Sequence, residues 1–335
     1  MNLNLRFAGF MAILISLVVS GCSQQTKAFE DAQGDLQAAY RQSELGNTQD
    51  ARKWVDLAIK ADPNDANLYT EKADAKNPQT DYTIAIVFAV SDDIPSMVLY
   101  MRKAAQQFPS EYVPLEILVE NDKTNGDTVD LQKDSAALVK LLQAELLLPS
   151  NSKDIEHLSV LLANAYCCAG NAAMGVQRYH NTMLVYPSKP DAFNGLAYYY
   201  AETNDKPHLQ EALADANKSL ALTKADPDLG DEDAANVQDT IAWIQYRMGD
   251  YADAEENSEL SVDDTPSIPD TRYHLAMIYE ALGKTDAAKV ELSHALLINP
   301  SYADAIAATN QLNNASTAAA LKTTVAMGTK AVQAR

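Results

Sequence analysis

Cysteine and glycine are both scarce in this chain, which has 3 of the former and 12 of the latter among 335 residues. The few glycines form no phosphate-cradling loop, and no serine lies in a GxSxG turn. The histidines form neither an i, i+4 metal pair nor a HExxH motif. We therefore predict that the protein is not an enzyme and that it has no catalytic residue, no metal and no cofactor.

Besides Cys22, the cysteines are the neighbours Cys167 and Cys168. A disulfide between adjacent residues is strained and does not fit in a helix, so we expect both to be packed thiols. The acidic run from Asp226 to Asp233 departs from the spacing of a calcium-binding loop and is interpreted as a solvated loop. We expect each histidine to be a surface or groove residue; the five are His157, His180, His208, His274 and His294.

Positive charge is also in short supply, because 26 Lys and Arg residues stand against 46 Asp and Glu residues, a net charge of −20. Binding to phosphates needs the opposite sign, so nucleic acid is excluded as a partner. Anionic lipid head groups would be repelled as well. The plain interpretation of the charge is solubility; the sharper one is a preference for a partner with a basic surface.

The N-terminal apolar run, from Phe7 to Ser20, is too short to span a membrane, which takes about 20 apolar residues. It fits the apolar region of a secretory signal peptide. The last two residues of this run and the two after it, Val19-Ser20-Gly21-Cys22, resemble the bacterial lipobox. This resemblance implies that residues 1–21 are removed, that Cys22 is acylated, and that residues 22–30 are a short tether. The alternative is an ordinary signal peptide with an incidental cysteine.

Several acyl chains on Cys22 would hold the mature protein firmly on a membrane. The residue after the cysteine is Ser23 and not Asp, which in enterobacteria-like sorting implies transfer to the outer membrane. We therefore expect a lipid-anchored protein of the bacterial cell envelope, in the outer membrane and facing the periplasm, with the inner membrane as the alternative.

The rest of the chain is predicted to be helical, because apolar residues recur at intervals of three and four and no segment alternates like a strand. Proline recurs at a roughly fixed interval, at positions 63, 109, 149, 187, 227, 266 and 300. An interval of this size is typical of stacked helical repeats.

One segment, Pro269 to Pro300, shows the repeat most clearly. Small or apolar residues and a turn glycine occupy its key positions, which are Leu275, Ala276, Tyr279, Gly283, Ala288, Leu292, Ala295 and Pro300. This pattern resembles the tetratricopeptide repeat, a helix-turn-helix unit of 34 residues. Gly249 lies 34 residues before Gly283, in phase. The small Ala276 and Ala288 would let the two helices cross closely, and Gly283 would end the first helix with a positive φ.

The resemblance implies an all-α fold, a right-handed solenoid of about seven such units over residues 31–312, with the N-terminal units degenerate. A short helix from Tyr302 to Leu312 would cover the last unit, since a solenoid needs a polar cap. Residues 313–335 are rich in Ala and Thr, and we expect a mobile tail or a frayed helix.

In this family the first helices of the units line a concave face that binds peptides. Carried onto this chain, the predicted partner-binding residues are Asn164, Asn194, Tyr198, Asp239, Trp243, Tyr246, Arg247, Tyr273 and Met277. Their mixture of aromatic and amide side chains is typical of binding hot spots. The alternative for the aromatic residues is that some belong to the core between units.

Two functions remain open. The first is a membrane-anchored scaffold that holds a peptide or protein partner at the envelope, in secretion, pilus, exopolysaccharide or cell-wall machinery. The second is a glycan- or peptidoglycan-binding protein that stacks sugar rings on the aromatic concave face.

Overall fold

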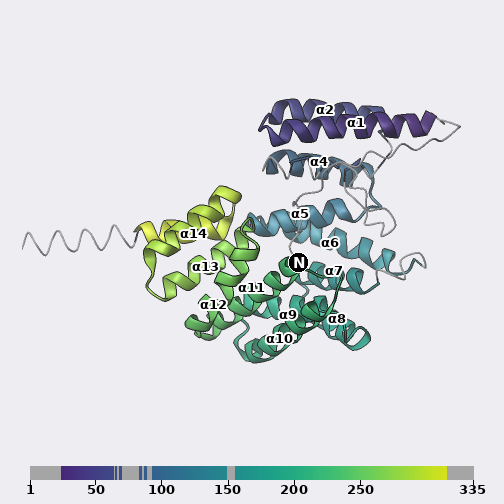
Figure 1. Ribbon diagram of the computed structural model, residues 1–335. Coiled ribbons are helices and arrows are strands. Elements are labelled where there is room, and N and C mark those ends of the chain that lie inside the picture. The colour runs from purple at the N-terminus through teal and green to yellow at the C-terminus, as the bar shows by residue number, and fades with distance from the viewer. Residues whose placement is uncertain are drawn as a thin grey trace, which may run out of the picture. The chain divides into compact units, whose positions relative to one another are not determined.

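The computed structural model describes residues 24–63, 93–148 and 155–314, together with positions 65, 68, 69, 83, 84, 87 and 88. Over these residues the chain is helical and contains no strand (Figure 1), which confirms the predicted all-α class. Cys22, the predicted signal peptide and residues 315–335 lie outside the described residues. The chain divides into two compact units, which are described separately: unit 1 lies mainly before Leu148, and unit 2 mainly after it.

Unit 1 begins with a helix pair. The first helix starts at Gln24, within the predicted tether, and the chain reverses at Gly46, whose φ is +73°. Helices α1 and α2 run side by side (Figure 1) and bury small and apolar residues spaced three and four apart, such as Leu36 and Val55. The helices of unit 1 are α1 (Gln24–Glu44), α2 (Thr48–Ala61), α4 (Ile94–Gln107), α5 (Val113–Thr124) and α6 (Thr128–Glu145).

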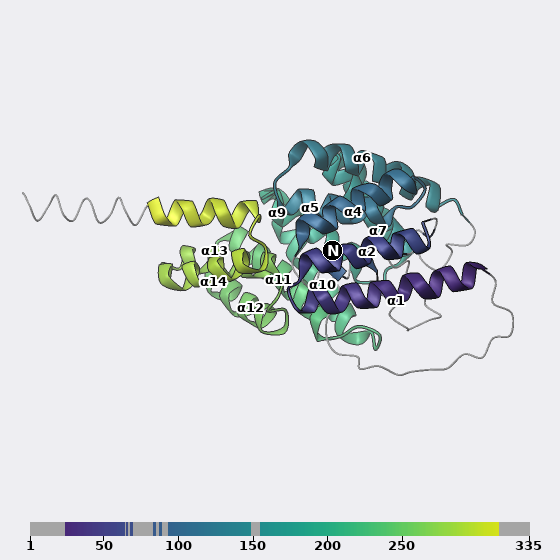
Figure 2. The same ribbon diagram turned by 90° about the horizontal axis from the view of Figure 1, so that it is seen from above.

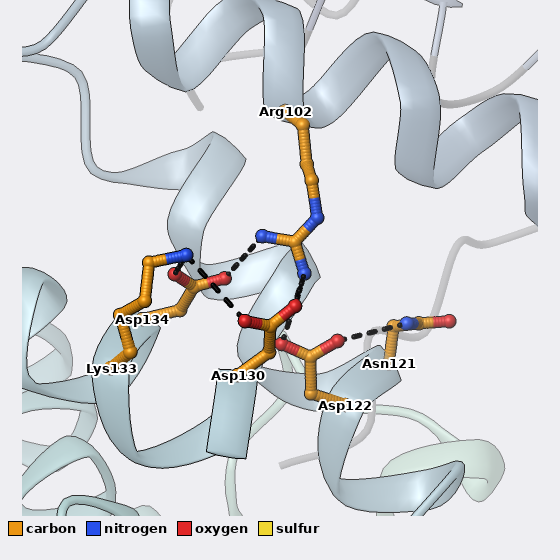
Figure 3. Close-up of polar contacts among 6 residues, drawn as sticks. All are labelled: Arg102, Asn121, Asp122, Asp130, Lys133 and Asp134. Carbon is orange, nitrogen blue, oxygen red and sulfur yellow. Dashed lines mark hydrogen bonds and ion pairs between the residues drawn. The ribbon is translucent and has the colours of Figure 1, made fainter. Parts of the chain in front are cut away.

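A charged cluster joins three helices of unit 1 (Figure 3), with Arg102 of α4 at its centre. Its terminal nitrogens lie 2.8 Å from the Oδ2 of Asp134, 2.9 Å from that of Asp130 and 3.5 Å from that of Asp122. The Asp122 and Asp134 side chains are almost fully buried. Because α5 supplies Asp122 and α6 supplies the other two, one guanidinium connects all three helices. We name Arg102, Asp122, Asp130 and Asp134 the arginine cluster.

Unit 2 is a series of helix pairs. The first helices α9, α11 and α13 contact one another in succession, while α10, α12 and α14 each pack on the helix before them. The helices of unit 2 are α7 (Ile155–Cys168), α8 (Ala172–Val185), α9 (Asp191–Glu202), α10 (Leu209–Ala225), α11 (Asp231–Met248), α12 (Tyr251–Asp264), α13 (Pro269–Ala281) and α14 (Thr285–Ile298), with a short 3-10 helix, η3 (Lys206–His208), before α10.

The repeat predicted from residues 269–300 has the expected geometry. Gly283 has a φ of +75° and Gly249 a φ of +90°, so both adopt the left-handed conformation that a side chain would strain. Ala276 and Ala288 are buried where α13 and α14 pack together. The predicted helix-turn-helix architecture is thus confirmed within this unit.

A last helix, residues 303–314, follows α14. Figure 2 shows it in yellow beside α13 and α14. Tyr302, Ala305 and Leu312 are buried on the same cluster as Leu292 of α14, so this helix covers the apolar face that the last pair would otherwise leave open.

Candidate functional site

All nine predicted partner-binding residues lie in unit 2. Most of them gather where α9, α11 and α13 meet, around a single apolar cluster that includes Trp243 and adjoins Tyr198, Tyr246, Tyr273 and Met277. Asn164 of α7 lies apart from this group and accepts a hydrogen bond from the hydroxyl of Tyr179. The Oδ1 of Asn194 is buried and has no hydrogen-bond partner within the described residues.

Trp243 is at the centre of this region, and its side chain is only 2% exposed. Tyr246 stacks on it at 4.7 Å between ring centroids, His274 stacks at 4.1 Å, and Tyr273 meets it edge-on at 6.0 Å. Its Nε1 donates a 2.7 Å hydrogen bond to Glu202 of α9. Trp243 therefore supports the site from beneath and offers no ring face to a partner. We name Trp243, Tyr246, Tyr273 and His274 the aromatic stack.

His274 is buried, with only 1% of it exposed, so the expectation of a surface or groove residue is wrong for this histidine. Its Nδ1 lies 2.9 and 3.1 Å from the two carboxylate oxygens of Asp239, which is also buried, and its Nε2 lies 3.9 Å from Glu202. A histidine on an apolar helix face can be buried when a carboxylate from the neighbouring repeat reaches it. The signal in the sequence was Asp239, which precedes His274 by 35 residues, about one repeat.

Electrostatics favour the charged form of this histidine. Burial by itself disfavours the imidazolium, but the negative charge of Asp239, its hydrogen bond, and the charges of Glu202 and Asp270 outweigh burial and raise the pKa of His274 above its usual range. The other histidines differ: His180 and His294 are exposed, and His157 and His208 are half-buried.

Arg247 lies over the stack with its guanidinium carbon 4.2 Å from the centroid of the Trp243 ring. Its Nε donates a 3.0 Å hydrogen bond to the carbonyl of Ala201, which fixes the plane of the group. Its two terminal nitrogens make no hydrogen bond or ion pair with any described residue. In an acidic chain, an arginine that is held in place and left unpaired at its outer edge is a candidate contact for a partner.

The half-buried residues around Arg247 provide the groups that a partner could contact. Tyr198, Tyr246, Tyr273 and Met277 offer ring faces, hydroxyls and a flexible apolar side chain. Burial raises the pKa of the Tyr246 and Tyr273 phenols, so both stay neutral and can donate or accept hydrogen bonds. This arrangement can bind a chain with mixed apolar and polar groups. We name Tyr198, Tyr246, Arg247, Tyr273 and Met277 the inner face.

The cysteines and the acidic side chains are the remaining candidates for a reactive or metal-binding site. Cys167 and Cys168 are half-buried thiols that form no disulfide within the described residues, and burial raises the pKa of Cys168. In the part of the chain that the structure describes, no group of three or more His, Cys, Asp or Glu side chains could hold a metal ion. Among the same residues, no helix has both the length and the apolar character needed to cross a membrane.

The comparison with known families decides the nature of the repeat. Residues 269–302 match the model of the tetratricopeptide repeat. The chain contains a tetratricopeptide repeat. This match covers α13 and α14, the pair whose turn at Gly283 is described above, and so confirms the resemblance seen in the sequence. A search of curated protein sequences finds no significant match.

Several solved structures are similar to this chain. Yeast Tom70 is 14% identical with a TM-score of 0.50, covering 90% of this chain and 57% of its own. A repeat protein from Parabacteroides merdae is 12% identical, with a TM-score of 0.48 and coverage of 83% of this chain and 99% of its own. A thermophilic repeat protein from Thermus thermophilus is 15% identical, with a TM-score of 0.45 and coverage of 56% and 98%. At 14% identity, the likeness to Tom70 shows the fold alone.

Proposed function

We propose that this chain is a membrane-anchored scaffold that binds a peptide or protein partner of the bacterial envelope through the inner face. The tetratricopeptide-repeat fold supports a role in protein–protein interaction. The observation that carries the proposal is Arg247, which the Ala201 carbonyl and the Trp243 ring hold in place while its terminal nitrogens have no partner within the described residues. Aromatic and arginine side chains positioned in this way commonly supply most of the binding energy of an interface.

The rest of the inner face indicates the kind of partner. The side chain of Glu202 is partly exposed beside the aromatic stack, and the whole chain carries a net charge of −20, which favours a partner with a basic surface. Arg247 needs one acceptor, such as a carboxylate or a backbone carbonyl, in the same partner. We therefore propose a mainly basic segment with an acceptor group opposite Arg247.

The anchor is part of the same proposal. Acyl chains on Cys22 would place the scaffold on the outer membrane, facing the periplasm. The lipobox-like residues Val19 to Cys22 support this, and they lie outside the described residues. Fractionation of the Cys22→Ser variant tests it: the variant should leave the membrane fraction, and retention there would contradict anchoring through this residue.

Crosslinking and pulldown from envelope fractions test the binding site. Arg247→Gln should lose the partner, whereas the control Arg178→Gln, on helix α8 of the same unit, should keep it. Circular dichroism of both variants shows whether the fold is intact. Equal recovery by the two variants would contradict this binding site. Binding to peptidoglycan fragments without any protein partner would instead favour the glycan-binding alternative, although the buried Trp243 cannot contribute a sugar-stacking face.

A further inference from the structure

The buried Asp239–His274 pair lies at the point where three successive first helices meet. His274 belongs to α13, Asp239 to α11, and Glu202, the second carboxylate near the imidazole, to α9. Trp243 of α11 completes the connection, because it stacks on His274 and donates a hydrogen bond to Glu202. A proton on one imidazole therefore affects contacts made by all three helices.

The groups that face His274 come from each of these helices. Helix α9 contributes Glu202 and the ring of Tyr198, whose centroid is 6.3 Å away; α11 contributes Asp239; and α13 itself contributes Asp270 and Tyr273. Arg247 lies over the Trp243 ring and is hydrogen-bonded to the Ala201 carbonyl. The charged groups that act on His274 are thus mainly anionic.

We propose that the Asp239–His274 pair is a proton-controlled element that sets how firmly α9, α11 and α13 hold Trp243 and Arg247 in place. When His274 is protonated, it makes a charge-assisted hydrogen bond to Asp239 and places a cation against the Trp243 ring. When the proton leaves, Asp239 stays buried without a counter-charge, and the stack on Trp243 loses its cationic component. The seam between α9, α11 and α13 then loosens, and Arg247 loses its fixed support.

The direction of the effect follows from the carboxylates. Burial would lower the pKa of His274, but Asp239, Glu202 and Asp270 together raise it. The element is therefore firm while His274 is protonated and loosens as the pH rises through the pKa of His274, which lies above the ordinary histidine value. Burying an ion pair contributes little to net stability, and a role in controlling this surface accounts for its presence between α9, α11 and α13. Its bearing on binding rests on the function proposed above, but the element itself can be tested without a partner.

The fluorescence of Trp243 provides the test, because the chain has 2 tryptophans and the other, Trp54, lies in unit 1. In a Trp54→Phe protein all indole emission comes from Trp243. A protonated imidazole quenches indole fluorescence more strongly than a neutral one, so the emission of Trp243 should rise as the pH rises and His274 loses its proton. Because the helices loosen at the same time, quenching by acrylamide should increase with the same midpoint. The midpoint of that curve should lie above the ordinary histidine value of about 6.5.

Two further variants identify the titrating group. His274→Gln in the Trp54→Phe background should abolish the transition, whereas His294→Gln, which changes a histidine with a 47% exposed side chain in the same unit, should leave it unchanged. If His274→Gln does not fold, an NMR titration that follows the ring protons of the five histidines in the unsubstituted protein gives the same information. A transition that is absent, that persists in His274→Gln, or that has an ordinary midpoint would overturn the proposal.

Hydrogen exchange and binding complete the experiment. Amides of α9, α11 and α13 should exchange faster at about pH 9 than at about pH 6, after correction for the intrinsic rate, and unchanged protection would overturn the loosening. Capture of the envelope partner should fall over the same pH interval. If the fluorescence transition is present but capture does not change, the pair does not control binding. The Arg247→Gln experiment still decides separately whether the inner face binds.

Discussion

The two units of this molecule connect successive helices by different chemistry. In unit 1, the arginine cluster links α4, α5 and α6 through one guanidinium and three carboxylates. In unit 2, the aromatic stack and the buried Asp239–His274 pair link α9, α11 and α13. In both units, paired helices bring side chains from neighbouring helices together. This architecture does not determine whether ion pairs or aromatic packing connect those side chains.

The two units also differ in how much of an arginine's hydrogen-bonding capacity the fold itself uses. Arg102 has three carboxylate partners and is fully used within the fold. Arg247 is held by a carbonyl and an aromatic ring and keeps its terminal nitrogens unpaired within the described residues. An arginine of the first kind stabilises its unit, whereas one of the second kind can bind a partner without the loss of an internal ion pair.

The largest expected effect comes from Trp243→Ala. Removing a buried indole should destabilise unit 2 by about 3 to 5 kcal/mol, because a cavity forms and the hydrogen bond to Glu202 is lost. Amide hydrogen exchange, read separately for peptides of each unit, measures this. Protection of unit 1 peptides is the internal control. A loss below about 1 kcal/mol would contradict a core role for this residue. For the same reason Trp243→Ala is a poor probe of binding.

Arg102→Met should have the next largest effect. It leaves three neighbouring carboxylates without their shared cation, two of them nearly buried, and should destabilise unit 1 by about 2 to 3 kcal/mol. Urea unfolding of a Trp243→Phe protein follows this through Trp54, the remaining tryptophan in unit 1.

The matched control for Arg102 is Lys133→Met. The side chain of Lys133 is 68% exposed, although it lies 3.5 Å from Asp130 and 3.7 Å from Asp134, so its loss should cost at most about 1 kcal/mol. If both substitutions had the same effect, the cluster would act as a diffuse surface charge pattern and the contrast between the units would disappear.

A smaller effect is expected at the turn between α13 and α14. Gly283 has a φ of +75° and no atom within 4 Å of the position where a Cβ would lie, so Gly283→Ala should cost about 1 kcal/mol through backbone strain alone. Thermal unfolding followed by circular dichroism measures it. The control is Gly230→Ala, since that glycine has a φ of −113° and also has no neighbouring atom within 4 Å. Equal losses would show that strain is not the cause.

The smallest expected effect is on the pH dependence of the stability of unit 2. His274 binds its proton more tightly in the folded than in the unfolded chain, so its stabilisation is complete below the unfolded pKa of about 6.5 and is lost as the pH rises through the folded pKa. The free energy of unfolding of unit 2 should therefore fall as the pH rises above about 6.5, as measured by denaturant titrations that follow Trp243 in a Trp54→Phe protein. In His274→Gln this slope should vanish; a slope that remains would assign it to another group.

Much of the fold could be predicted because the repeat is a local pattern. Gly283, Ala276, Ala288 and Leu292 have the turn conformation or the burial that their spacing indicated. The inner-face residues came from the resemblance to the repeat family, and the structure places them on α9, α11 and α13; that they bind a partner stays a prediction. The N-terminal repeats also stay a prediction, because fewer of their positions keep the pattern.

What periodicity could not predict is which of these residues a neighbour covers. Trp243 and Tyr246 are three residues apart on α11, yet the first is buried and the second half-buried. Glu202, which bonds to Trp243, is 41 residues away from it, and Asp239 is 35 residues from His274. These contacts run between helices of different repeats, where no local spacing rule applies.

The sequence by itself therefore determined that the chain forms paired helices and where α13 and α14 turn, because these properties depend on residues within one repeat. The side of α9, α11 and α13 expected to face a partner followed from the resemblance to the repeat family. Only the tertiary structure decided that Trp243 supports the surface while Arg247 extends from it, and that His274 is buried against a carboxylate. The physical reason is that burial and pKa depend on groups that three separate helices bring together, and their proximity exists only when the helices are packed.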